Sequence, residues 1–158
     1  MFEWYTAVIF WKSQTPWPSL RGGFYDWYLE PTGGYWGVRR ACAEPVHVQM
    51  NQSSRELAVV SRAFEAVKAK NVEARFYDLT RSSSAQVGKT IDCSVDTIRP
   101  NAVTDLGCSV GWPDAHEGVL LLRLELFNGL DILSTNEYWL APPGESAEEK
   151  AWASWRAW

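Results

Sequence analysis

The sequence has few of the residues that build metal sites and disulfide frameworks. Its only two histidines, His47 and His116, stand far apart and in neither an HxxxH nor an HExxH spacing, so no metal site is predicted. The three cysteines, Cys42, Cys93 and Cys108, form no CxxC pair. Their odd number argues against a disulfide framework, and we expect buried thiols. A single bridge between Cys93 and Cys108 is the alternative.

Several functional signatures are also missing. The chain has no block of basic residues and carries a net charge of -4, from 15 Lys and Arg against 19 Asp and Glu, so nucleic acid is not an expected partner. It has no apolar run long enough to span a membrane. It has no phosphate loop, GxGxxG or nucleophile elbow, and no cofactor is predicted. The first residues, MFEWYTAVIFW, lack a basic segment and a cleavage site, so no signal peptide is predicted and the compartment stays unassigned.

What the chain does have is aromatic residues, including ten tryptophans, three of them (Trp11, Trp17 and Trp27) between residues 6 and 35. Residues 6–11 (TAVIFW) form a continuous apolar run, which is typical of a strand buried on both faces of a parallel sheet. A polar loop with two prolines follows at residues 12–18, and Ser19 is a suitable N-cap. A helix is expected from there to Glu30, and one face of it would carry Leu20, Phe24, Trp27 and Tyr28. This strand, loop and helix form the repeating unit of a (β/α)8 barrel.

Beyond Glu30 the chain changes character twice. Gly33-Gly34 is expected to be a turn and residues 35–43 a second short helix. After Pro45 come seven short runs rich in β-branched and aromatic residues, bounded by turn residues. They cover residues 46–50, 56–62, 71–79, 87–98, 102–110, 118–127 and 131–140. This pattern predicts an immunoglobulin-like β-sandwich without the Cys…Trp…Cys spacing of antibody domains.

The run at residues 120–127 shows the clearest alternation of the seven. Leu120, Leu122, Leu124 and Leu126 would share one face of a strand, and the other face is mixed. Asn128-Gly129, between this run and the next, is a hairpin signal. The sequence therefore predicts a leucine face packed on the sandwich core and a tight turn after it.

The loop at residues 11–17 carries binding chemistry but no acid. Trp11 and Trp17 offer flat aromatic faces, and Lys12, Ser13 and Gln14 offer hydrogen-bonding groups, a mixture that suits a polar small-molecule site. In the alternative, Trp17 packs under the loop and Trp11 closes a core. A retaining glycosidase needs two carboxyl groups about 5–5.5 Å apart. The loop has none, and the nearest acids fall in the expected helix, so no catalytic residue is predicted.

Residues 5–140 resemble glycoside hydrolase family 2, strongly up to Gln49 and loosely after it. The resemblance is to the end of the catalytic barrel and the following immunoglobulin-like domain in the exo-β-D-glucosaminidase and mannosylglycoprotein endo-β-mannosidase branch. The motifs that carry it are Trp11, Trp17-Pro18, YDWY (25–28), PTGG (31–34), GVRRA (37–41) and EPVHVQ (44–49). The motif WKSQ at residues 11–14 is closer to the mannosidases than to the glucosaminidases. The motif NEYWL (136–140) resembles the last strands of the family's sandwich domain.

The resemblance implies a retaining β-glycosidase that hydrolyses β-glucosaminide or β-mannoside bonds, with both catalytic glutamates on earlier barrel strands. It implies that Trp11 is a floor or wall of the subsite for the cleaved sugar, with Lys12, Ser13, Gln14 and Trp17 beside it. On this interpretation the chain is a fragment, inactive alone, whose partner in the parent enzyme is a β-linked glucosamine or mannose oligosaccharide. Its exposed barrel remnant would favour self-association.

The expected organisation is a mainly β chain in three parts. Residues 1–43 would be the last β/α unit and a short helix of an incomplete barrel, and residues 44–141 would be the sandwich. Residues 142–158 would be a tail, with a helix as one possible structure, because its tryptophans recur at every third position. Two alternatives to a fragment remain open. One is a free-standing carbohydrate-binding or protein-interaction module, and the other is a subunit that completes a barrel encoded by a separate chain.

Overall fold

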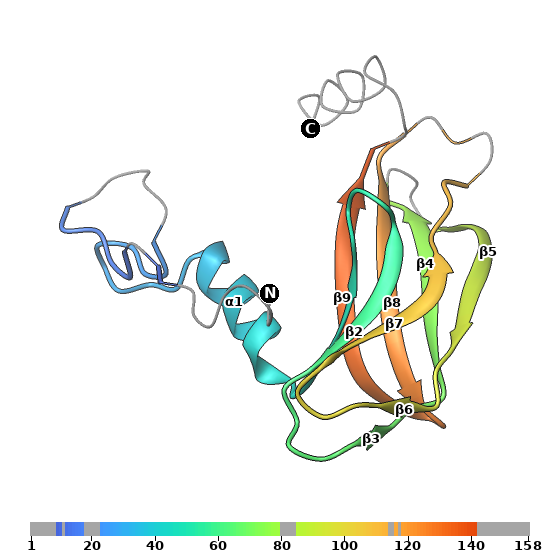
Figure 1. Cartoon of the computed structure of the whole chain (residues 1–158). Helices are drawn as coiled ribbons and strands as arrows, with labels where there is room; N and C mark the ends of the chain where they lie inside the picture. Colours follow the sequence, from blue (N-terminus) through green and yellow to red (C-terminus); the bar gives the residue numbers. More distant parts are fainter. Residues whose placement is uncertain are drawn as a thin grey trace. The chain divides into compact units, whose positions relative to one another are not determined.

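The computed structural model describes residues 9–10, 12–17, 23–79, 85–113, 116 and 118–141. The chain divides into two compact units, residues 1–45 and residues 46–158 (Figure 1). The whole tail predicted at residues 142–158, and residues 6–8 and 11 of the predicted first strand, lie outside the described part.

The second unit is a β-sandwich of two antiparallel sheets (Figure 1). Three strands, in the order β1-β2-β7, form one sheet: β1 (Val46–Met50), β2 (Glu56–Ser61) and β7 (Val103–Ser109). Four strands, in the order β5-β4-β8-β9, form the other: β4 (Asn71–Asp78), β5 (Ala85–Ser94), β8 (Leu120–Asn128) and β9 (Asp131–Leu140). Two short strands, β3 (Val67–Lys68) and β6 (Thr97–Ile98), pair with each other. The predicted sandwich is confirmed, and each predicted run contains a strand.

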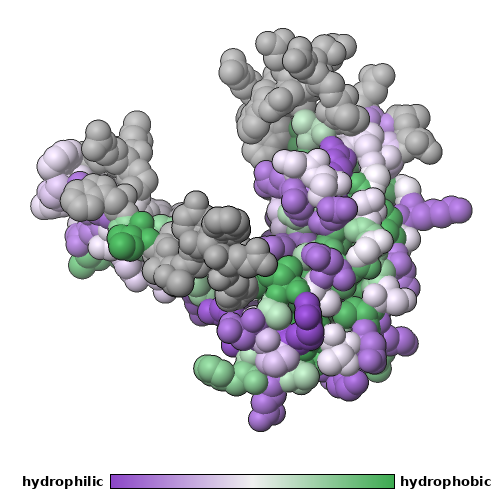
Figure 2. All heavy atoms as spheres, viewed as in Figure 1, coloured by the Kyte–Doolittle hydropathy of each residue, from purple (hydrophilic) through white to green (hydrophobic). Residues whose placement is uncertain are grey.

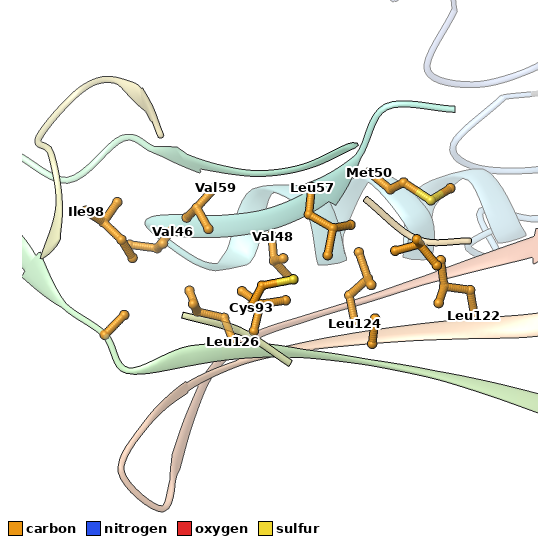
Figure 3. Packing of buried hydrophobic residues seen from close by; sticks show 14 of the residues in the cluster. Val46, Val48, Met50, Leu57, Val59, Cys93, Ile98, Leu122, Leu124 and Leu126 are labelled. Atoms are coloured by element: carbon orange, nitrogen blue, oxygen red, sulfur yellow. The ribbon is translucent and has the colours of Figure 1, made fainter. Parts of the chain in front are cut away.

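The sandwich core forms where the two sheets face each other. Leu120, Leu122, Leu124 and Leu126 of β8 are completely buried, as the alternation predicted. Leu122, Leu124 and Leu126 lie opposite apolar side chains of the other sheet (Figure 3), among them Val46, Val48, Met50, Leu57 and Val59. The hairpin is also confirmed, since Asn128 pairs with Asp131 and Gly129 adopts a φ of 66°.

The outer face of the four-stranded sheet carries paired charges. Glu125 of β8 is only 6% exposed, and its carboxylate accepts hydrogen bonds from the guanidinium groups of Arg75 and Arg123. Arg75 also bonds Glu73 on its own strand. These groups neutralise one another across β4 and β8. Figure 2 shows hydrophilic and hydrophobic residues interspersed over the visible face of this unit.

One side of the sandwich is closed by side chains of β9 that bond the backbone of β1. The Val48 N–H donates to Ser134 Oγ (3.2 Å), and the Met50 N–H donates to the Tyr138 hydroxyl (3.0 Å). Asn136 Nδ2 donates to the Val48 carbonyl (3.0 Å). Strand β1 is the edge of its sheet and β9 the edge of the other. The three side chains therefore satisfy backbone groups that an edge strand otherwise leaves open.

The other side is closed by a disulfide between Cys93 of β5 and Cys108 of β7, whose Cα atoms are 6.3 Å apart. The expectation of buried thiols was wrong for all three cysteines, because Cys93 and Cys108 form a disulfide and Cys42 is exposed. The pairing follows from the topology, because β5 and β7 are edge strands of opposite sheets and the fold brings them together. Cysteine count and spacing along the chain do not carry that information.

Among its described residues, the first unit contains one helix, α1 (Gly33–Ala43). The predicted short helix at residues 35–43 is confirmed, but the turn expected at Gly33-Gly34 is wrong, because these glycines form the first turn of α1. Its N-cap residue, Thr32, bonds the Gly23 carbonyl through its hydroxyl rather than capping the helix. Glycine at the N-terminal end costs less than in a helix interior, since the first backbone N–H groups have no intrahelical acceptors.

The longer helix predicted up to Glu30 is wrong over its described part, residues 23–30, which form turns and isolated bridges. Asp26 Oδ1 accepts the backbone N–H groups of Tyr28 (2.8 Å) and Glu30 (2.9 Å). Leu29 has a left-handed φ of 67°. The aspartate offers the backbone an alternative to helical hydrogen bonds, which helical spacing of apolar residues does not reveal. Ile9 and Phe10, expected in the first strand, belong to no strand and are exposed.

Candidate functional site

The candidate loop at residues 12–17 is held by the segment that follows it. The Ser13 carbonyl accepts the backbone N–H groups of both Phe24 and Tyr25 at 2.9 Å. Gln14 forms an isolated parallel bridge with Tyr25. The backbone of Ser13 and Gln14 is thus used structurally, while both side chains are exposed.

Within this loop the structure brings Lys12 and Trp17 together. The Lys12 ammonium lies 5.4 Å from the centre of the Trp17 ring, a cation–π contact. The Trp17 side chain is 58% exposed, so it does not pack under the loop as the alternative interpretation held. The contact presents an aromatic surface and a cation side by side. Trp11, the predicted centre of the site, lies outside the described residues.

No carboxylate of the loop is available for catalysis, because residues 12–17 contain none. The nearest downstream acid, Asp26, uses its side chain to accept two backbone N–H groups of its own turn. That is a structural role, as expected for this residue, although in a turn rather than on a helix. Among the described residues, no group of His, Cys, Asp and Glu is arranged to hold a metal ion, and no helix is long and apolar enough to cross a membrane.

An aromatic cluster next to the loop was not singled out as a site from the sequence. The Tyr25 and Tyr35 rings lie 5.3 Å apart, and Tyr35 packs edge-on against Trp36 at 5.1 Å. The Arg39 guanidinium lies 5.2 Å from the Trp36 ring centre. Burial and the neighbouring Tyr35 raise the pKa of the Tyr25 phenol above its ordinary value of 10.0. The YDWY sequence was the only signal that pointed to this cluster.

The described residues of the first unit form almost no buried interior. Among its described residues only Thr15 is buried, and its hydroxyl oxygen has no hydrogen-bond partner. Large apolar side chains are exposed instead: Ile9, Phe10, Trp17, Trp27, Tyr28, Leu29 and Trp36. Helix α1 has no buried residue at all. Exposed apolar patches are characteristic of surfaces that interact with other molecules.

Fold and site together define a β-sandwich domain preceded by an aromatic segment whose described residues bury little. No protein-family model matches the chain. It is 35% identical over 145 residues, or 91% of its length, to the mannosylglycoprotein endo-β-mannosidase of Lilium longiflorum. It is 28% identical over 138 residues to the exo-β-D-glucosaminidase of Hypocrea jecorina. These enzymes identify the chain as a relative of glycoside hydrolase family 2, in agreement with the resemblance read from the sequence.

Solved structures support the fold. The structure of Amycolatopsis orientalis exo-chitosanase CsxA matches 85% of this chain with a TM-score of 0.69 and 22% identity. At that identity the likeness shows the fold alone. The match covers 15% of the CsxA chain, and this chain likewise spans about 15% of the lily and Hypocrea enzymes. What those whole enzymes do is therefore not established for this chain by the likeness.

Proposed function

We propose that this chain is the end of the catalytic barrel and the following sandwich of a retaining β-glycosidase acting on β-glucosaminide or β-mannoside bonds. The observation that carries the proposal is the first unit's surface, which exposes seven large apolar side chains over a segment with a single buried residue among those described. Burial of that surface against the rest of a barrel would remove it from water, which is the dominant favourable term in folding and association.

In the parent enzyme, the loop at residues 11–17 forms one wall of the subsite for the cleaved sugar. Trp11 and Trp17 supply aromatic surface against the apolar face of a sugar ring. Lys12, Ser13 and Gln14 supply hydrogen-bonding groups for its hydroxyls. The contact between Lys12 and Trp17 and the exposed side chains of Ser13 and Gln14 support this arrangement.

Alone, the chain hydrolyses nothing, because the loop has no carboxyl pair. General-acid protonation of the leaving oxygen and nucleophilic attack each require a carboxyl group. Asp26, the nearest described acid downstream of the loop, is engaged by its own turn. The catalytic glutamates that the family resemblance implies belong to earlier barrel strands.

The test is an assay of the purified chain with p-nitrophenyl β-glucosaminide and p-nitrophenyl β-mannoside. We expect no turnover above that of a Lys12→Ala/Trp17→Ala variant carried through the same purification, which reports contaminating activity. Turnover by the wild-type chain that the variant lacks would overturn the proposal. Turnover that arises only on mixing with a separately encoded barrel would instead identify the chain as a subunit.

A further inference from the structure

A groove opens on the sandwich on the side where β5 and β7 meet. It encloses about 490 Å³, within the range of about 300–1,000 Å³ typical of small-molecule sites. Its walls come from β4, from β5 and from the segment after β7. They are formed by Phe76, Val87, Gly88, Lys89, Ile91, Gly111, Trp112 and Pro113.

The groove exists because β5 carries an irregular bulge. Ala74 of β4 pairs with Ile91 and Phe76 pairs with Val87, so residues 88–90 of β5 stand opposite Arg75 alone. Gly88 has a φ of 73°, a conformation that favours glycine, and a Cβ there would meet Pro113 at 3.6 Å. Bulges bend an edge strand out of its ladder and are frequent beside functional sites.

Trp112 in this groove is fixed by three neighbours. Its Nε1 donates to the His116 carbonyl at 2.9 Å, and its ring packs edge-on with Phe76 at 6.0 Å between centres. The Arg55 guanidinium lies 5.6 Å from the ring centre. A ring held in this way is ready to contact a ligand without first losing side-chain freedom.

Arg55 is itself held in an unfavourable conformation. Its φ is 60°, in the left-handed region that side-chain-bearing residues rarely occupy. Two backbone hydrogen bonds maintain it: its N–H donates to the Asn51 carbonyl (2.7 Å), and its carbonyl accepts the Val110 N–H (2.9 Å). Strained residues of this kind cluster at ligand clamps and active sites. The strain places a cation beside Trp112.

The charge of the groove favours one chemical class of ligand. Among the described residues that line the groove, Lys89 is the only charged one, and Arg55 adds a second positive charge at Trp112. A glucosamine polymer carries ammonium groups, which these cations repel. Mannose-type glycans are neutral and offer apolar ring faces to aromatic walls and hydroxyls to Lys89 and to the backbone at the two glycines.

We propose that this groove is a second, non-catalytic glycan-binding site that takes a neutral, mannose-type oligosaccharide in preference to one of glucosamine. This proposal rests on the proposed function in one respect only, since it takes the substrate of the parent enzyme to be a β-linked glycan. Its lining residues belong to the second unit, whereas the loop at residues 12–17 belongs to the first, so the two sites can be tested with separate variants. It would hold substrate while leaving the chemistry to the barrel.

The experiment titrates the full chain, labelled with ¹⁵N, with β-1,4-mannotriose and with a glucosamine trimer, and follows the backbone amide signals of Gly88 and Gly111. We expect saturable shifts of both signals at about millimolar mannotriose, the weak end of ligand affinities. At low salt the glucosamine trimer should bind about tenfold more weakly, because of like-charge repulsion. No saturable shift, or equal affinity for the two trimers, would overturn the proposal.

Two variants locate the site. A Cβ at Gly111 meets nothing within 4 Å and its φ is ordinary, so Gly111→Trp should fold and fill the groove, abolishing the mannotriose shift of the remaining reporter, Gly88. Lys89→Glu should raise affinity for the glucosamine trimer about tenfold, whereas Lys70→Glu, an exposed lysine outside the lining, should leave both affinities unchanged. Binding retained in Gly111→Trp with an unchanged melting temperature would contradict the location. The hydrolysis assay of the proposed function does not affect these outcomes.

Discussion

Met50 and Tyr138 are 88 positions apart in the chain and are joined by a hydrogen bond of 3.0 Å from the Met50 N–H to the Tyr138 hydroxyl. Asn136 Nδ2 donates to the same hydroxyl at 2.9 Å. The bond is one of three by which side chains of β9 satisfy the backbone of β1. Backbone pairing within each sheet does not reach across this side of the sandwich, so these side chains decide how well the edge is closed.

The first prediction concerns that hydroxyl. Tyr138→Phe should lower the free energy of unfolding by about 1–2 kcal/mol, because it leaves the Met50 N–H without its acceptor. Tyr77→Phe, on the outer face of β4, is the matched control and should change the free energy of unfolding by less than about 0.5 kcal/mol. Urea denaturation of both variants measures the difference. Equal stabilities would show that water replaces the lost hydroxyl.

The second prediction is a pH dependence. Burial raises the pKa of the Tyr138 phenol above its ordinary value of 10.0, although hydrogen bonds from the Met50 N–H and Asn136 act to lower it. The folded state therefore holds this proton more tightly than the unfolded state. The resulting stabilisation is fully present below pH 10 and is lost as the pH rises from 10 through the folded-state pKa. Between pH 9 and 11.5, wild type should lose stability more steeply than Tyr138→Phe, and parallel curves would contradict this.

A third prediction compares adjacent leucines of β8. Leu122 is completely buried and Leu121 faces outward. Leu122→Ala should cost about 2–5 kcal/mol of unfolding free energy, from lost burial and the cavity left behind. Leu121→Ala should cost markedly less. Thermal melting of both variants tests the assignment of the two faces. A larger loss of stability in Leu121→Ala would mean that the other face of β8 packs on the core.

The fourth prediction concerns the disulfide. Cys93→Ser should lower the free energy of unfolding by about 3 kcal/mol, because the bridge closes a loop with a sequence separation of 15 and restricts the unfolded chain. Reduction of the wild-type protein should have a similar effect. Cys42→Ser, in the exposed part of α1, is the control and should leave the unfolding curve unchanged. A wild-type melting temperature that is insensitive to reductant would argue against the bridge.

The fifth prediction concerns the exposed aromatic surface of the first unit. The full chain should self-associate with increasing concentration, because its first 45 residues expose seven large apolar side chains. A protein limited to residues 46–158 should unfold cooperatively, since the sandwich core lies within it, and should associate less. Analytical ultracentrifugation of both proteins measures the association. A monodisperse full-length monomer would count against the barrel-fragment proposal.

Much of the sandwich could be predicted from the sequence because its signals are local. The leucine alternation in β8 and the Asn128-Gly129 turn depend only on neighbouring residues. The disulfide could not be predicted in the same way, because Cys93 and Cys108 meet only after two sheets stack. The helix expected up to Glu30 failed because Asp26 captures backbone N–H groups that a helix would use.

The candidate loop was predictable in composition but not in geometry. That Lys12 and Trp17 stand near each other follows from a short loop, but their stacking depends on how Ser13 is held by the segment at residues 24–25. The groove at Trp112 could not be predicted at all. It requires the bulge in β5, the left-handed Arg55 and the segment after β7, and each is set by tertiary packing.

The bonds between β1 and β9 have a mechanical consequence. Val48 bonds Ser134, and Met50, further along β1, bonds Tyr138, further along β9. The two strands therefore run parallel to each other. A force that pulls the start of β1 away from the end of β9 slides one strand along the other and strains all three bonds at once. Bonds loaded together in shear resist better than bonds that open one after another. The sandwich should therefore resist a pull applied between the start of β1 and the end of β9.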